Sequence, residues 1–431
     1  MTSSVRARAR AAFRGTRALR IPAFRILFGA QVVSFIGTWS QNLATSLLVL
    51  HLTGSAAALG LVTAVQFGPT LILSPFTGRV LDRVDVRRLL IGTSTLSATT
   101  ALVLAVLAAT GHAPVWSLGV ATGLFGVAQA FDRPGIYTLL PRFIDADHRS
   151  SAISLITTSG AAARLAGPAL AGLIYATLGP AACFAANGAS YLVVVIALLF
   201  LRRGESADRP TTIRRAETFG LRYAWHHPDL RDALLANVAI GGLTFNFAVM
   251  LAAMVTFTYR GGSNYVGLAY STDAVGAVLG GLVAVGARLN RRRLALAAGA
   301  LGVTVAAAGV APNLAVFFVI LPVMGIAITW YQSTVTALVQ QVAEPAMLGR
   351  MMSLLTLGWF GTTPFGALLI GWVADAFSAR AAMTVAGGTA LGCALLLLLP
   401  RILLPRKRRG PAPDPPPRAV SRTPSREEGL T

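Results

Sequence analysis

The feature that most limits the fold of this chain is a series of apolar runs, each long enough to cross a lipid bilayer. A helix that rises about 1.5 Å per residue needs roughly 20 residues to cross a hydrocarbon core of about 30 Å. Turn-forming stretches such as "TGSA" (53–56), "LGP" (178–180) and "RGGSN" (260–264) separate the runs. Twelve runs are present, near residues 24–50, 57–80, 89–110, 115–139, 151–177, 181–201, 232–257, 264–287, 294–311, 313–338, 350–374 and 382–404. The sequence therefore predicts an all-α membrane protein with twelve transmembrane helices.

The charged residues agree with a membrane location and indicate an orientation. Only 12% of residues are charged, against about 25% in an average soluble domain. Apart from Arg133, Arg164, Arg260 and Arg380, every arginine and the one lysine lie on the side of the predicted membrane that holds both termini. The positive-inside rule places that side in the cytoplasm. The net charge of +21 is thus shared among short loops, which argues against a nucleic-acid partner, since that requires a basic patch on a folded surface.

The composition of the loops and termini divides the chain into five predicted regions. The tail is basic and Pro-rich, without apolar periodicity, and is expected to be disordered. No cleavable signal peptide is evident before the first run. The regions are a basic cytoplasmic segment (1–20), a six-helix bundle (21–201), a cytoplasmic linker (202–231), a second six-helix bundle (232–404) and the tail (405–431).

An internal repeat relates the two predicted bundles. At an offset of 199 residues, Ser154, Gly167 and Gly172 face Ser353, Gly366 and Gly371. Near an offset of 207 residues, "LGL" (59–61) faces "VGL" (266–268). Two pseudo-symmetric six-helix halves are predicted, arranged as parallel repeats with a substrate site between them near the membrane midplane.

The loop between the second and third runs carries a dense charged motif, "GRVLDRVDVRR" (78–88). It resembles the loop 2–3 signature of the major facilitator superfamily in Gly78, Asp82, Arg83, Arg87 and Arg88, and departs from it at Asp85 and Val86. "SFIGTWSQNLATSLLVLHLTGSAAALGLVTA" (34–64) and "RLAGPALAG" (164–172) are similar to segments of its enterobactin-exporter-like, or transmembrane secretion effector, subgroup. The resemblance covers residues 20–404 and implies the major facilitator fold and export.

The resemblance also implies that the first, fourth, seventh and tenth helices line a central cavity. Polar residues gather in these runs, and Trp39, Trp330 and Trp359 fit either stacking on a substrate or filling the bundle. The third, sixth, ninth and twelfth runs contain no ionisable acid or base in their interiors and are expected to face lipid. The cavity candidates are Gln31, Gln41, Asn42, Gln129, Asp132, Asn237, Asn246, Tyr331 and Gln332.

Four charges remain inside predicted helices, namely Asp132, Arg133, Arg164 and Asp273. A charge at the bilayer centre costs about 2.5–3.5 kcal/mol on insertion scales, so each needs water or a partner. Arg133 is near enough to the cytoplasmic face to reach water. Arg164 is predicted to pair with the acid of the fourth helix, Asp132, with Asp273, or with an anionic substrate group.

Two motifs have predicted structural roles. Gly167, Pro168 and Gly172 resemble the helix 5 motif of proton-coupled antiporters, and they also fit simple helix packing and bending. Asp82 is predicted to cap the start of the eleventh helix near Gly349–Ser353 when the cavity faces outward, because unsatisfied N–H groups and the helix dipole favour an anion there.

The sequence thus predicts a bacterial inner-membrane secondary transporter, acting as a monomer surrounded by lipid. Cys183, Cys393 and the histidines lack partners at ligand spacing, so no metal site or other cofactor is predicted. No P-loop is present, which favours an ion gradient, with Asp132 or Asp273 carrying the proton. The predicted substrate is a small amphipathic drug, antibiotic or siderophore. An uptake permease or a lipid transporter are the alternatives, and a membrane enzyme or a scaffold fits least because hydrolase motifs are missing.

Overall fold

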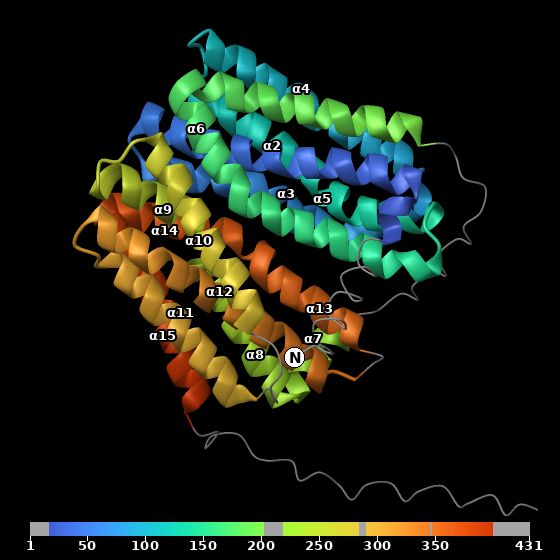
Figure 1. Cartoon of the computed structure of the whole chain (residues 1–431). Coiled ribbons are helices and arrows are strands. Elements are labelled where there is room, and N and C mark those ends of the chain that lie inside the picture. Colours follow the sequence, from blue (N-terminus) through green and yellow to red (C-terminus); the bar gives the residue numbers. More distant parts are fainter. Residues whose placement is uncertain (1–16, 202–218, 284–289, 345–346, 400–431) are drawn as a thin grey trace, which may run out of the picture. The chain divides into compact units, whose positions relative to one another are not determined.

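A computed structural model describes residues 17–201, 219–283, 290–344 and 347–399, and these ranges contain helices and no strand (Figure 1). The expected basic segment up to residue 16, linker residues 202–218 and the tail lie outside the described residues, as do run ends 284–287 and 400–404. Seven described stretches are long and apolar enough to cross a membrane, and one of them covers two predicted runs. Each of the twelve predicted runs falls in a helical segment, consistent with the twelve-helix fold.

The N-terminal half follows the predicted runs closely, with one continuous element where two helices were expected. The short 3-10 turns η1 (Arg17–Arg20) and η2 (Leu140–Arg142) flank its helices. Within α6, Gly179 has φ 79° and ψ 180°, a conformation open to glycine, and Pro180 begins the second part. The break coincides with the predicted "LGP" turn, so α6 supplies the fifth and sixth spans. The helices are α2 (Pro22–Thr53), α3 (Ala56–Arg83), α4 (Val86–Ala109), α5 (Val115–Leu139) and α6 (Ala146–Phe200).

The C-terminal half contains three π-helical segments that the apolar runs did not indicate. The runs 232–257 and 350–374 are each interrupted by such segments. The short helix α7 lies within the predicted linker. The elements are α7 (Phe219–His226), α8 (Pro228–Ala239), η3 (Ile240–Thr244), α9 (Phe247–Ala253), η4 (Met254–Thr258), α10 (Ser263–Val283), α11 (Arg291–Gly309), α12 (Leu314–Val342), α13 (Leu348–Thr356), η5 (Leu357–Gly361), α14 (Thr363–Ala376) and α15 (Ala379–Leu398).

Two of the π segments, η3 and η5, lie against each other. A Cβ atom added to Gly241 would meet the Gly358 carbonyl and would lie 3.0 Å from the Cα of Trp359. The Asn237 amide donates to the carbonyl of Leu355 over 2.9 Å, just before η5. A side chain inserted into the hydrogen-bond ladder is one cause of helix irregularity. We therefore attribute the interruption of the eleventh span, which contains η5, to this contact with the seventh span, which contains η3.

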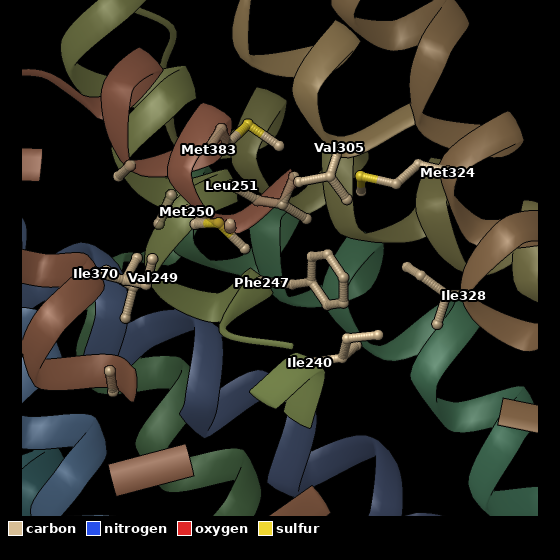
Figure 2. Close-up of a cluster of buried hydrophobic side chains, with 14 of the residues drawn as sticks. Ile240, Phe247, Val249, Met250, Leu251, Val305, Met324, Ile328, Ile370 and Met383 are labelled. Atoms are coloured by element: carbon tan, nitrogen blue, oxygen red, sulfur yellow. The ribbon is translucent and has the colours of Figure 1, made fainter. Parts of the chain in front are cut away.

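The C-terminal half has a continuous apolar core. Figure 2 shows side chains of α9, α11, α12, α14 and α15 directed toward one another, among them Leu251, Val305, Met324, Ile370 and Met383. Elsewhere large apolar side chains are exposed, such as Phe200 (73%), Val319 (71%) and Leu395 (64%). Water-soluble monomers rarely expose large apolar patches, so this exposure agrees with a membrane location.

The two halves contact each other through two equivalent helix crossings. Where α3 crosses α14, a Cβ atom on Gly60 would meet the Ala367 carbonyl and lie 3.4 Å from the Cα of Gly371. Where α10 crosses α6, a Cβ atom on Gly267 would lie 2.5 Å from the Pro168 carbonyl oxygen and 2.9 Å from the Cα of Gly172. Gly60 and Gly267 correspond to each other at the repeat offset of 207, and Gly172 and Gly371 correspond at the offset of 199. This matching geometry agrees with the pseudo-symmetric plan of two six-helix halves.

Candidate functional site

An ion pair joins the two halves beside one of these crossings. Arg164 Nη2 of α6 lies 3.7 Å from Asp273 Oδ2 of α10, and the two elements lie side by side in Figure 1. The Asp273 side chain is only 4% exposed, whereas that of Arg164 is 35% exposed. The other carboxylate oxygen of Asp273, Oδ1, has no hydrogen-bond partner among the described residues. The aspartate is thus buried with one free oxygen, while the arginine remains accessible.

Close packing fixes the position of Asp273. A Cβ atom on Gly325 of α12 would lie 2.7 Å from the backbone nitrogen of Ala277, and would also meet the Asp273 carbonyl. One helical turn before Asp273, the Tyr270 hydroxyl donates to the Ala248 carbonyl over 2.9 Å. Tyr270 was not among the predicted site residues, although its place three residues before Asp273 puts both on one helix face.

Asp132 lies within the N-terminal half and contacts a different partner from those expected. The Thr93 hydroxyl of α4 donates to Asp132 Oδ1 over 2.5 Å. In this conformation no ion pair among the described residues joins Asp132 to Arg164 or Arg133, and Arg164 pairs with Asp273, the other acid predicted for it. Arg133, one residue further round the helix, is exposed. The carboxylate therefore points toward α4, into the bundle.

Several predicted cavity residues form hydrogen bonds inside the N-terminal half. The Asn187 amide donates to Gln41 Oε1 over 2.7 Å, and the Gln129 amide donates to the Tyr191 hydroxyl over 2.6 Å. Asn187 and Tyr191 both belong to the sixth span and are buried. The sixth span, which was expected to face lipid, exposes Leu192, Val193 and Ile196 on one side. Its inward side carries these polar residues, which tie the first and fourth spans to it.

The first span makes a further polar contact with the second. The Gln66 amide donates to Asn42 Oδ1 over 3.0 Å. At the repeat offset of 207, Gln66 is the counterpart of Asp273, so the charged position of one half is a neutral amide in the other. Gln31 is buried on the same helix as Asn42.

The remaining cavity candidates occupy mixed environments. The Asn246 amide donates to the Gly242 carbonyl, and its own carbonyl oxygen is buried without a partner among the described residues. The Tyr331 hydroxyl is likewise buried and unpartnered there. Gln332 is half-buried, and Trp330 is half-buried against the core of the C-terminal half. Within the described part of the chain, no hydrogen bond or ion pair connects these four side chains to the Arg164–Asp273 pair.

The helix 5 motif packs both within and between the halves. A Cβ atom on Gly167 would lie 2.6 Å from the Cβ of Trp39, so this glycine holds α6 against α2. Pro168 and Gly172 instead form the crossing with Gly267 of α10. Both observations fit the packing alternative that the sequence left open for the motif.

The loop 2–3 motif divides into a structured part and an exposed part. Asp85 caps α4 by accepting hydrogen bonds from the backbone N–H groups of Arg87 and Arg88. The Arg87 guanidinium donates to the carbonyl oxygens of Leu198 and Leu199 over 2.7 and 2.9 Å, at the end of α6. Asp85, which departs from the family pattern, is thus a helix cap, a role that an acidic residue before a helical run indicates.

The other residues of the motif are open in this conformation. Asp82 and Arg83 are exposed, and a Cβ atom on Gly78 would meet nothing within 4 Å. Among the described residues, no hydrogen bond joins Asp82 to Gly349–Ser353. The predicted capping of the eleventh span by Asp82 was tied to the outward-facing state, and it stays a prediction.

Comparison with known proteins assigns the chain to a family. The model of the family described as transmembrane secretion effector matches residues 15–414, nearly the whole chain. The chain belongs to the transmembrane secretion effector family of major facilitator transporters. It is a multi-pass membrane protein that transports a small molecule.

Curated relatives of this transmembrane secretion effector cover most of its length. Macrolide efflux protein A of Streptococcus pyogenes is 23% identical over 82% of this chain and 89% of its own. The staphyloferrin A transporter of Staphylococcus aureus is 24% identical over 84% and 92%, respectively. The multidrug efflux pump Tap of Mycolicibacterium fortuitum is 26% identical over 91% and 98%.

Solved structures agree on the fold. A bacterial homologue of the lysosomal transporter Spinster, in an inward-facing and unoccupied conformation, aligns with a TM-score of 0.66 at 16% identity, over 88% of this chain and 95% of its own. A D-xylose–proton symporter aligns with a TM-score of 0.69 at 12% identity, over 88% and 97%. At these identities the likeness concerns the fold alone.

Proposed function

We propose that this transporter is a proton-coupled exporter of a small amphipathic molecule and works by alternating access. The observation that carries the proposal is the Arg164–Asp273 pair, which joins the two halves in the middle of two spans. A contact of this kind must break when the halves move apart and re-form when they return. The ion pair is therefore intact in one conformation of the transporter and separated in the other. A charge inside a membrane helix is costly and is by default a functional candidate.

The substrate class rests on the relatives. Their names include a macrolide efflux protein, a multidrug efflux pump and a staphyloferrin A transporter. These names support a drug, antibiotic or siderophore as substrate and export as direction. Transport of a lipid is one alternative, and uptake of such a molecule is another, which the experiment below separates from export.

Asp273 and Asp132 are the proposed proton carriers. Asp273 has one oxygen near Arg164 and one oxygen without a partner. If the halves separate, Arg164 withdraws toward water or an anionic substrate group, and the buried carboxylate then gains most by binding a proton. Asp132 accepts a hydrogen bond from the neutral donor Thr93, and no ion pair to it is present in the described structure, so it is proposed to bind a proton without first losing a charged partner.

The test uses inverted vesicles that contain the wild type, Asp132→Asn or Asp273→Asn. Wild-type vesicles are expected to accumulate a macrolide or siderophore probe only with a proton gradient. A coupling variant should lose gradient-driven accumulation and keep substrate counterflow without a gradient. Wild-type accumulation by both variants would remove both carboxylates from coupling, and a gradient-driven loss of probe from the vesicles would indicate uptake.

The further proposals concern location and partners. We place the protein in the cytoplasmic membrane of a bacterium as a lipid-embedded monomer, with both termini in the cytoplasm, no enzymatic activity and no nucleic-acid partner. The arginine distribution supports the orientation. Single cysteines at His112, between α4 and α5, and at Arg292, at the start of α11, test it. Only the cysteine at His112 should react with an impermeant thiol reagent added to intact cells.

A further inference from the structure

A carboxylate of the C-terminal half caps a helix of the N-terminal half. Asp375 accepts hydrogen bonds from the Ser55 hydroxyl (2.5 Å) and from the backbone N–H groups of Ala56 (2.7 Å) and Ala57 (3.0 Å). Ser55 is the N-cap residue of α3, and Asp375 is the penultimate residue of α14. These three hydrogen bonds, called here the outer cap, lie at the end of the spans that is proposed to face away from the cytoplasm.

The position of Asp375 is unfavourable for its own helix. An acidic residue near a helix C-terminus is repelled by the dipole of that helix, whereas the start of another helix attracts it. Ala56 and Ala57 are among the first N–H groups of α3, which have no partner within the helix. The carboxylate is therefore stabilised chiefly by the opposite half of the protein, and it loses that stabilisation when the halves part at this end.

The helix crossing itself does not require the carboxylate. The equivalent crossing of α6 and α10 has the same close glycine contacts. At the repeat offset of 199, the counterpart of Asp375 is Ala176, an exposed residue of α6. The α3–α14 crossing thus carries a charged contact at its outer end, whereas the ion pair beside the α6–α10 crossing lies in the middle of its spans. The outer cap is therefore an addition to the packing.

Asp375 also matches the predicted role of Asp82. The two helices run antiparallel, and each has an aspartate as its penultimate residue, Asp82 in α3 and Asp375 in α14. Each aspartate lies at the end where the partner span begins. In this structure Asp375 accepts hydrogen bonds from its partner helix α3, whereas Asp82 is exposed.

We propose that Asp375 is a positioning residue of the transport cycle, whose outer cap holds α3 and α14 together while the transporter is closed to the outside. The proposal rests on the proposed alternating access and adds a residue to it. Closing the outer end forms three hydrogen bonds to one carboxylate, and opening that end breaks them. The state of the outer cap therefore biases the ratio of inward-facing to outward-facing protein.

The test measures that ratio in purified protein without substrate. Spin labels are attached at His112 and Val310 for the outer end, and at Asp147 and Arg292 for the cytoplasmic end, in a background in which Cys183 and Cys393 are replaced by Ala. All four labelled positions are exposed. Asp375→Asn should reduce the inward-facing population relative to the outward-facing one by about fivefold, since the hydrogen bonds are charge-assisted but open to water. Outer label distances should lengthen as cytoplasmic ones shorten.

Two controls separate this role from simple stabilisation. Asp145 is another exposed carboxylate, at the N-cap position of α6, and its side chain makes no capping hydrogen bond. Asp145→Asn should therefore leave both distance distributions unchanged. Thermal unfolding of Asp375→Asn is measured in parallel. Reduced stability with unchanged distances would make the outer cap a structural feature only and overturn the proposal, as would unchanged distances with unchanged stability.

The result does not depend on the identity of the substrate. If wild-type vesicles fail to accumulate any probe, the proposed export fails, while the label distances still report whether Asp375 shifts the two states. If the wild type transports and Asp375→Asn leaves its distances unchanged, the inference fails and the proposed function stands.

Discussion

The Arg164–Asp273 pair is asymmetric, because the aspartate is buried and the arginine is one-third exposed. Arg164→Leu leaves a carboxylate alone in the interior and should destabilise the protein by about 3 kcal/mol. Asp273→Leu leaves a guanidinium that reaches water, and should cost about 1 kcal/mol. Thermal unfolding in detergent measures the order, and the double variant should recover part of the loss. A larger loss for Asp273→Leu would contradict the geometry.

The hydroxyl of Thr93 provides a second test at this scale, because it donates to Asp132. Thr93→Ser keeps the hydroxyl and Thr93→Val keeps the shape. If Asp132 takes part in coupling, Thr93→Val should lower gradient-driven transport about tenfold, and Thr93→Ser should stay within about twofold of the wild type. Uptake rates in inverted vesicles, normalised to the amount of inserted protein, compare the pair. Equal rates in the two variants would show that the hydrogen bond has no part in transport.

The sequence indicated the intramembrane charges and offered Asp273 as one partner of Arg164, but it did not indicate the residues that contact Asp132 and the cavity amides. Asp132, Arg164 and Asp273 stand out because a charge in an apolar run is rare. Thr93, Asn187 and Tyr191 do not, since a single polar residue within a run is compatible with many orientations. Their roles depend on which faces of neighbouring helices meet, and that follows from the packing of the whole bundle.

At the scale of elements, the close crossing of α3 and α14 depends on Gly60. Its added Cβ would meet the Ala367 carbonyl, and backbone cannot rotate away. Gly60→Ala should therefore force the crossing apart and lower transport about tenfold, in line with the usual overpacking cost of about 1–3 kcal/mol. Gly68→Ala lies in the same helix with nothing within 4 Å and is the matched control. Equal transport by both variants would contradict the close crossing.

Hydropathy alone located the helical elements, because about 20 consecutive apolar residues have few alternatives in a membrane. Gly179 and Pro180 predicted the break within α6, because glycine and proline interrupt a helix through their own backbone properties. The π segments η3 and η5 were not predicted. They arise where Gly241 and Gly358 let two spans meet, and Asn237 reaches the partner helix, so their cause lies in a contact more than one hundred residues away along the chain.

At the scale of the whole molecule, the repeat offsets predicted two related halves, and the structure shows where the halves differ. The position of Asp273 is Gln66 in the other half, and that of Asp375 is Ala176. The sequence contained both differences, but only the structure shows that the two aspartates lie at the two crossings between the halves. The two crossings are packed alike but carry different charges. The α6–α10 crossing has the Arg164–Asp273 ion pair, and the α3–α14 crossing has the outer cap.

The antiparallel arrangement of α3 and α14 leads to a prediction about the whole transport cycle. Asp375 caps α3 in this conformation, and Asp82 is predicted to cap the start of α13 when the cytoplasmic end closes. Asp82→Asn should therefore raise the inward-facing population about fivefold, opposite in sign to the effect of Asp375→Asn, and the two changes together should return the ratio to within about twofold of the wild type. The same two label pairs measure all three variants. A shift of Asp82→Asn in the same direction as Asp375→Asn, or a double variant that behaves like either single one, would show that the two carboxylates do not act at opposite ends of one equilibrium.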